Sequence, residues 1–525
     1  MKNILNHQSS RIESSALILA IFAIIGSCLS VFRNALLAST FGASRMVDMY
    51  YASFRIPDFI FNIFILGALA AGFIPLFIKY SNIGKKEANE FGTSIMVGIS
   101  FFSALLGIIF VIFANPIIKL LFPGFSSADL HIIANLSRII MVQPILLGLS
   151  SLIGNILQVN NLYVPVAIAP LLYNLGIISG IVIFYPLFGL YGLAYGVVVG
   201  AFLNLIIKYW PFRKVDFVFS MPHSSIFKKY IKEFTSLTVF RALSIINLQL
   251  FLFVISNVAS YLKAGSLGIM TFASNIQDFP RSVFAMSFAI ASFPILSKQF
   301  ANKEKKEFTD TYQKTLTQIL AFLIPIFFAF LVFREQIVRL LLGYGKFDWS
   351  ATTSTIFVFT ILIFGFVVHS LHDFLLNVLF AVNNTKAPFF SGLSAFSIAG
   401  ILAFYLGKKF GLPGLALSCV VADTLYFLFL FLNTLRYLEP QIIKNLFSRV
   451  SLISLSAFIS GIFAWLTLHF MNTIFSSSKI FFLVINSFVS GMVMVTIYLI
   501  LMSWFKMEEF NTIIGFFKKR LFKLK

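Results

Sequence analysis

Residues 90–114 read EFGTSIMVGISFFSALLGIIFVIFA, a stretch whose only charged side chain is the first one, Glu90. A helix needs about 20 consecutive apolar residues to cross the hydrocarbon core of a bilayer. The stretch also lacks the alternating pattern of a membrane β-strand. It therefore predicts a membrane-spanning α-helix.

Thirteen more stretches of this kind occur along the chain. Hydrophobic residues make up 59% of the chain and charged residues only 11%, whereas a soluble domain carries roughly 25% charged residues. We therefore expect an all-α polytopic membrane protein with fourteen transmembrane helices. Together with the first, the stretches lie approximately at 14–38, 47–78, 90–114, 131–157, 163–184, 188–210, 234–260, 266–297, 310–333, 352–380, 387–407, 412–435, 447–471 and 479–504.

The formal net charge is +21, and the positions of the Lys and Arg residues along the chain explain this excess. With the N-terminus placed inside, 26 of the 40 Lys and Arg residues fall on that side and nine fall in the opposite loops. This asymmetry follows the positive-inside rule, so we expect both termini in the cytoplasm. The basic excess then reflects topology rather than a nucleic-acid partner. The basic tail, KKR at 518–520, either contacts anionic membrane lipids or is solvated.

A short motif occurs twice, as FGLYGLA at 188–194 and as FGLPGLA at 410–416, a shift of 222 residues. The shift covers six predicted helices, an even number, so it predicts two parallel repeats around a central cavity. We expect an N-terminal lobe over 1–225, a C-terminal lobe over 226–440, and two further helices with a basic tail over 441–525. Two more pairs support the repeat: VNN at 159–161 with VNN at 382–384, and YAS at 51–53 with FAS at 272–274.

Ionisable side chains occur inside several predicted helices, where each costs at least about 2.5–3.5 kcal/mol at the bilayer centre on insertion scales. Two such segments match between the halves, RIPD at 55–58 and DFPR at 278–281. A proline removes a helix hydrogen bond, so Pro57 and Pro280, with Gly67, are predicted gate or hinge positions. The alternatives are an ion pair within the first segment and close helix packing at Gly67.

Arginine suits an anionic headgroup because it stays ionised and can hold a phosphate through two parallel hydrogen bonds. We predict that Arg33, Arg55 and Arg281 bind a substrate of this kind. Arg33 lies near a predicted helix end, where snorkelling to the interface is the alternative. Asp373 and Asp423 are predicted ion-coupling residues from their position in the membrane, and ion pairing within the second lobe is the alternative.

Several catalytic motifs are missing from the sequence: it has no Walker A segment, no GxSxG and no HExxH. The segment HSLHD at 369–373 has no second ligand cluster in the sequence, so we expect no bound metal. Without a nucleotide site, energy has to come from an ion gradient, the membrane potential or removal of product. We expect a transporter rather than an enzyme, with no cofactor beyond a coupling cation.

An ordered set of motifs carries a family resemblance: RNALLA at 33–38, FGA at 41–43, Asp48, FRIP at 54–57, GA at 67–68, FIP at 73–75, PGF at 123–125, DFP at 278–280, FP at 293–294 and YGKF at 344–347. This set resembles the MurJ (MviN) family of lipid II flippases in the MOP exporter superfamily. The resemblance covers approximately residues 14–440, and the last two helices match mainly in number.

The resemblance implies a flippase of lipid II, the undecaprenyl-pyrophosphate-linked muropeptide, in the bacterial cytoplasmic membrane. It implies alternating access around a cationic cavity, driven by the membrane potential or by a cation such as sodium, and a hydrophobic groove beside the last two helices for the lipid tail. Cell-wall synthesis enzymes are expected partners. The family's roles match Arg33, as a headgroup-binding arginine, and Asp48 and Asp278, as acidic positions near the outer gate and at the start of the eighth helix.

The chain departs from the family at three positions where cavity arginines are common, since it has Ser27, Phe61 and Asn275 there. Arg55 and Arg281 lie nearby in sequence and are hypothesised to replace them as phosphate contacts.

Three other functions fit parts of the pattern. A flippase for another polyprenyl-linked glycan would share the diphosphate chemistry. A cation-coupled drug antiporter would favour an acidic cavity, and Arg33, Arg55 and Arg281 argue against such a cavity. A non-transporting membrane scaffold for cell-wall enzymes would need no cavity.

Overall fold

The structure is a computed structural model that describes residues 12–63, 68–475, 480–507 and 509–510. In these residues the regular elements are α-helices with a few π-helical turns, and none is a strand. The predicted all-α class is confirmed.

Thirteen helices within the described residues are long and apolar enough to cross a membrane. They coincide with thirteen of the predicted stretches. The remaining stretch, 47–78, contains α3 (Arg45–Phe61) and α4 (Ala68–Ile83), and residues 64–67 between them are outside the described residues. Pro57 lies inside α3. The other predicted hinge in this stretch, Gly67, is outside the described residues.

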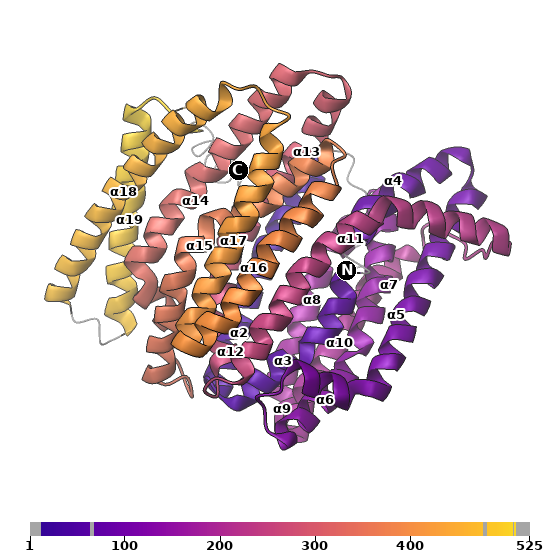
Figure 1. The fold of residues 1–525 in the computed structure, drawn as a ribbon, viewed down its shortest axis with the longest axis horizontal. Helices are drawn as coiled ribbons and strands as arrows, with labels where there is room; N and C mark the ends of the chain where they lie inside the picture. The colour runs from indigo at the N-terminus through magenta and orange to yellow at the C-terminus, as the bar shows by residue number, and fades with distance from the viewer. Residues whose placement is uncertain (1–11, 64–67, 476–479, 508, 511–525) are drawn as a thin grey trace. The chain divides into compact units, whose positions relative to one another are not determined.

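The chain forms two compact units (Figure 1). The first unit comprises residues 1–271 with two short later segments, 344–348 and 400–415. Its helices are α2 (Ile12–Phe41), α3, α4, α5 (Lys85–Leu121), α6 (Ser127–Ile140), α7 (Val142–Val159), α8 (Val164–Ser179), α9 (Tyr185–Phe188), α10 (Leu190–Phe212) and α11 (Ser224–Ser260), with the π-helical η2 (Gly180–Phe184) between α8 and α9.

Glycines bring α8 and α10 into backbone contact within the first unit. A Cβ atom on Gly176 of α8 would lie 2.2 Å from the Cα of Gly200, and one on Gly196 would lie 2.4 Å from the Cα of Gly180, the first residue of η2. Membrane helices associate closely through such small residues because apolar side chains gain nothing by leaving lipid. This contact fixes the position of α8, which also packs against α2 and carries Asn174.

The second unit comprises residues 272–343, 349–399 and 416–525. Its core helices α14 (Lys305–Leu342), α18 (Ile442–Ile474) and α19 (Ile480–Trp504) pack through Phe333, Ala464, Leu468 and Met494. Its elements are most of α12 (Ser266–Pro280), η3 (Arg281–Ala285), α13 (Met286–Ala301), α14 (Lys305–Leu342), α15 (Trp349–Ala381), most of α16 (Lys386–Phe410), α17 (Leu412–Leu435), α18 (Ile442–Ile474) and α19 (Ile480–Trp504).

The helix changes type at Pro280, where α12 ends and the π-helical η3 begins. Proline has no N–H group to donate to the backbone hydrogen bonds of a helix. π-Helical turns occur often at functional sites. A hinge role for Pro280 stays a prediction. The predicted lobes stay a prediction as well. The compact units are defined by which helices pack together, and α11 packs with α4 and α5 in the first unit, whereas the predicted C-terminal lobe includes it.

Candidate functional site

Arg33 lies on α2 in the first unit, where neutral side chains hold its guanidinium group. Nη1 donates to Oδ1 of Asn174 at 2.9 Å. Nη2 donates to Oδ1 of Asn34 at 3.1 Å and to Oγ of Ser30 at 3.3 Å. The amide nitrogen of Asn174 donates to the carbonyl of Pro170 at 3.1 Å, which directs the side-chain oxygen towards Arg33.

The guanidinium of Arg33 is therefore oriented by neutral groups, and Asp58 interacts with it electrostatically without forming an ion pair. Among the residues that the structure describes, no carboxylate lies within ion-pairing distance of this guanidinium. A cation without a directly paired anion is costly inside a membrane protein, and an anion that replaces the neutral acceptors recovers part of that cost. The arrangement is suited to binding a phosphate or carboxylate group.

The other predicted residues of this unit lie on α3. Arg55 is half-buried, and Pro57 two positions later is buried. Oδ1 of Asp58 accepts a long hydrogen bond, 3.5 Å, from Nε2 of Gln143 on α7. Whether Arg55 takes the place of a family arginine stays a prediction.

Asp48 is buried near the start of α3, and both of its carboxylate oxygens bond to the beginning of α12. Oδ2 accepts from the backbone N–H of Gly265 at 2.6 Å, and Oδ1 accepts from that of Gly268 at 2.9 Å. Gly265 has φ +89°, and a Cβ there would lie 2.2 Å from the carbonyl oxygen of Ala43. Asp48 thus acts as a cap that stabilises unpaired N–H groups at a helix N-terminus. Its predicted substrate contact stays a prediction.

Arg281, in contrast, lies in a charged cluster of the second unit. Its Nε donates to Oδ2 of Asp373 at 3.1 Å, and its Nη1 donates to Oδ1 of Asp278 at 3.0 Å. Nη1 also lies 3.1 Å from Nε2 of His369. The structure therefore brings three predicted residues together, but the guanidinium of Arg281 already has two carboxylate partners.

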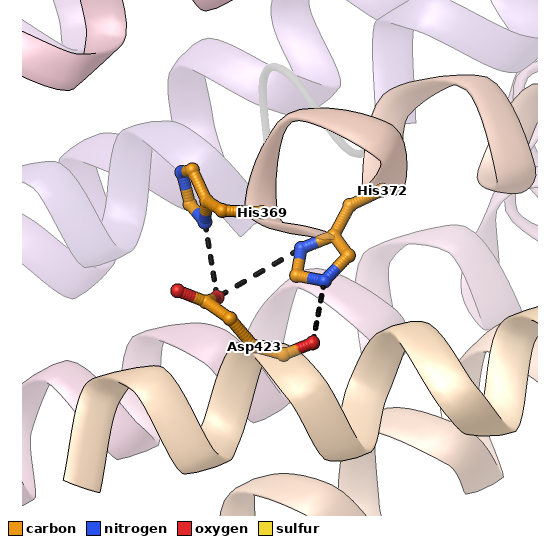
Figure 2. Close-up of side chains that lie close together, drawn as sticks. All are labelled: His369, His372 and Asp423. Carbon is orange, nitrogen blue, oxygen red and sulfur yellow. Dashed lines mark hydrogen bonds and ion pairs between the residues drawn. The ribbon is translucent and has the colours of Figure 1, made fainter. Parts of the chain in front are cut away.

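Asp423, on α17, joins the same cluster through two histidines of α15 (Figure 2). Its Oδ1 lies 3.0 Å from Nδ1 of His369 and 3.9 Å from Nδ1 of His372. Its backbone carbonyl oxygen lies 3.0 Å from Nε2 of His372. The predicted ion-coupling residues Asp373 and Asp423 are thus both engaged within the second unit, by Arg281 and by the histidines.

Two buried polar residues, Asn174 and Lys208, were not among the site residues predicted from the sequence. Asn174 carries no charge and is one of many amides in apolar sequence. Lys208 was counted among the cytoplasmic basic residues, yet it is buried on α10, with Nζ 3.5 Å from the position of a Cβ on Gly154. Its position near a helix end gave no sign of burial, because the hydropathy pattern does not report which face meets a neighbouring helix.

An apolar groove of about 240 Å³ lies in the second unit, between α14, η3 and α19. Phe284, Phe322, Pro325 and Met494 contribute to its lining. Tyr498 also lines it, but its hydroxyl donates to the carbonyl of Ala321 at 2.8 Å, so the polar end is satisfied. The surface is suited to a hydrocarbon chain.

Comparison with known proteins gives a consistent result. The family model "Lipid II flippase MurJ" matches residues 37–504. The chain is 23% identical over 420 residues to "Lipid II flippase MurJ" of Burkholderia cenocepacia, covering 78% of this chain and 81% of the relative. It is 27% identical over 436 residues to "Probable lipid II flippase MurJ" of Buchnera aphidicola subsp. Schizaphis graminum, covering 80% and 82%.

Solved structures agree on the fold. A structure described as "Lipid II flippase MurJ, inward closed conformation" matches with a TM-score of 0.77 at 24% identity, covering 93% of this chain and 98% of that one. An inward-facing multidrug resistance MATE family transporter of the MOP superfamily matches with a TM-score of 0.67 at 15% identity, covering 80% and 98%. Because the family model spans most of its length, this chain belongs to the lipid II flippase MurJ family.

Proposed function

We propose that this chain moves lipid II from the inner to the outer leaflet of the bacterial cytoplasmic membrane. Membership of the family and the names of its relatives supply the substrate. The observation that carries the proposal at the level of residues is Arg33, whose guanidinium is positioned by neutral groups and has no carboxylate partner among the described residues.

Lipid II carries a diphosphate, and the geometry around Arg33 suits it. A guanidinium has five N–H groups in a planar fork that matches two phosphate oxygens. Asn174, Asn34 and Ser30 hold the fork in one orientation. They compete for it less strongly than a carboxylate would, because an amide or hydroxyl oxygen lacks the negative charge of a phosphate oxygen.

The polyprenyl tail requires an apolar surface, and the groove between α14, η3 and α19 supports this part of the proposal. Each buried CH₂ contributes about 0.8 kcal/mol when it leaves water, but little when it leaves lipid. The groove therefore orients the tail rather than supplying most of the affinity.

We propose further that flipping proceeds by alternating access of two lobes, powered by the membrane potential or by a cation such as sodium. Moving one charge across 100 mV supplies about 2.3 kcal/mol. Both termini are proposed to be cytoplasmic, with cell-wall synthesis enzymes as partners. A coupling role for Asp373 and Asp423 requires an ion to compete with Arg281 and the histidines.

The test is the sidedness of lipid II in cells depleted of this protein and complemented with variants. Wild type and Arg138→Ala are expected to restore flipping, because Arg138 donates to Val111 and Asn135 and belongs to no predicted site. Arg33→Ala is expected to leave lipid II on the inner leaflet, and Arg33→Lys to restore it in part.

Other outcomes contradict the proposal in distinct ways. Unchanged lipid II sidedness on depletion favours a scaffold. Accumulation of a different polyprenyl-linked glycan favours the related flippase. Full transport by Arg55→Ala and Arg281→Ala, with loss in Arg33→Ala, would show that neither arginine replaces a family arginine.

A further inference from the structure

His369, His372 and Asp423 bring three metal-ligand side chains together inside the second unit (Figure 2). One ligand atom from each lies within 4.8 Å of the others. The two histidines are three residues apart on α15 and so share one face of that helix. Asp423 comes from α17, more than 50 residues further along the chain.

The hydrogen bonds of His372 leave one lone pair directed at the carboxylate. Nε2 is 3.0 Å from the backbone carbonyl oxygen of Asp423, and a carbonyl only accepts, so Nε2 carries the proton. Nδ1 is therefore the unprotonated nitrogen, and it lies 3.9 Å from Oδ1 of Asp423. Zinc bonds to nitrogen and oxygen are about 2.0–2.2 Å long, so one ion can bridge two atoms at this separation.

The second ring nitrogen of His372 has a partner of the kind found around metal sites, whereas that of His369 is in contact with Arg281. A metal-binding histidine usually donates its other N–H to a carbonyl or carboxylate. His372 has that carbonyl in Asp423. For His369, Nε2 is 3.1 Å from Nη1 of Arg281, and a guanidinium only donates, so Nε2 accepts and the N–H at Nδ1 donates to Oδ1 of Asp423 at 3.0 Å. Nε2 also lies 3.9 Å from Oδ1 of Asp278. An ion on Nδ1 would place the proton on Nε2, facing Asp278 in place of the present contact with Arg281.

The charge of the cluster also favours a divalent cation. The cluster contains three carboxylates and one guanidinium: Arg281 pairs with Asp278 and Asp373, and Asp423 contacts His369. With neutral histidines the formal charge is −2. Asp278 is half exposed, but Asp373 and Asp423 are largely shielded from solvent, where unbalanced charge is costly. A divalent ion makes the formal sum zero.

We infer that His369, His372 and Asp423 form a binding site for a divalent transition-metal cation of the zinc type. Two imidazoles and one carboxylate suit zinc and its first-row neighbours, and three protein ligands leave a fourth position for water. The ion connects α15 to α17. Through His369 it also competes with Arg281 at the beginning of η3, so metal binding and the Arg281 contacts are linked.

The experiment uses the full chain, purified without a polyhistidine tag and stripped with chelator, and Co²⁺ as a spectroscopic probe. Wild type is expected to bind one Co²⁺ with tetrahedral absorption that Zn²⁺ displaces. His469→Ala is the matched control, because His469 lies in the membrane helix α18, stacked on Trp465 and outside the cluster. His372→Ala and Asp423→Asn are expected to weaken binding by at least about tenfold.

Folding of the variants is controlled by a conservative replacement and a second readout. His372→Cys keeps a zinc ligand and is expected to retain Zn²⁺ binding. Zn²⁺ is expected to raise the melting temperature of wild type and His469→Ala but not of His372→Ala. The inference is overturned if wild type binds no Co²⁺, if His372→Ala binds it as tightly as wild type, or if Na⁺ with chelator stabilises wild type as much as Zn²⁺ does.

Discussion

Two arginines of the same predicted role have opposite surroundings. Arg281 donates to the carboxylates of Asp373 and Asp278. Arg33 donates only to amide and hydroxyl oxygens among the described residues, with Asn174 as the partner from another helix. The positive charge of Arg281 is satisfied within the protein, whereas that of Arg33 is available to a ligand. Asn174 contributes to this difference, because it provides a neutral acceptor where a carboxylate would form an ion pair with Arg33.

Asn174→Asp tests this point with almost no change in shape. A carboxylate 2.9 Å from Nη1 would pair with Arg33 and compete with a diphosphate. We expect the affinity for undecaprenyl diphosphate, measured with purified protein in nanodiscs, to fall about 10- to 100-fold, since a hydrogen bond to a charged group contributes about 1.5–3 kcal/mol. Asn174→Ala only loosens Arg33 and is expected to have a smaller effect.

The matched control is Asn204→Asp, because Asn204 is also buried in the first unit but bonds to Ser150 at 2.6 Å. Diphosphate binding by Asn174→Asp that equals wild type, with unchanged melting temperature, would remove Arg33 from the headgroup site.

At the scale of elements, the α8–α10 contact determines where Asn174 lies relative to Arg33. Gly176, two residues after Asn174, has the backbone of Gly200 at 2.2 Å from its Cβ position. Gly176→Ala therefore has to separate the helices, and overpacking of this kind costs typically about 1–3 kcal/mol. We expect a lower melting temperature and weaker diphosphate binding in the same variant.

Gly491→Ala is the control for this change, since it makes the same substitution in a membrane helix, α19, with no atom within 4 Å of the Cβ position. Alanine has the higher helix propensity, so this variant is expected to match or slightly exceed wild type in stability. Equal melting temperatures for Gly176→Ala and wild type would contradict a close backbone contact.

The elements also show which parts of the structure a hydropathy pattern can predict. Lipid requires long apolar helices, so the fourteen stretches were visible in the sequence. The π-helical η3 was not visible, because local backbone irregularity leaves the mean hydropathy unchanged.

The site was predictable only for charged side chains, which are conspicuous in apolar sequence. Arg33 stood out in this way, but its partner Asn174 lies 141 residues away and is neutral. Asp423 was noticed, yet its contact with His369 depends on the rotation of α15 and α17 about their own axes. Helix rotation follows from side-chain packing between helices, which a single sequence does not specify.

At the scale of the whole molecule, orientation in the membrane decides in which direction a flippase can work. The side of the membrane on which each end of α11 lies can be measured and reports this orientation. The helix has 37 residues, Ser224–Ser260. At 1.5 Å per residue this is about 55 Å, well beyond a hydrocarbon core of about 30 Å, so the helix is long enough for its two ends to reach opposite aqueous phases. Six basic residues lie between Lys208 and Lys232 near its start, and a single one, Lys263, follows its end. The charge difference predicts a cytoplasmic start.

Ser225→Cys and Ala264→Cys place a thiol at exposed positions at either end of α11, in a chain whose Cys28 and Cys419 are replaced by serine. We expect a membrane-impermeant maleimide to label Ala264→Cys in intact spheroplasts and Ser225→Cys only after the membrane is opened. The reverse pattern would place both termini outside, and labelling of both thiols in intact spheroplasts would mean that α11 does not cross the membrane. Since the helix is continuous, the two thiols control for each other, and the positive-inside argument for every other loop depends on their result.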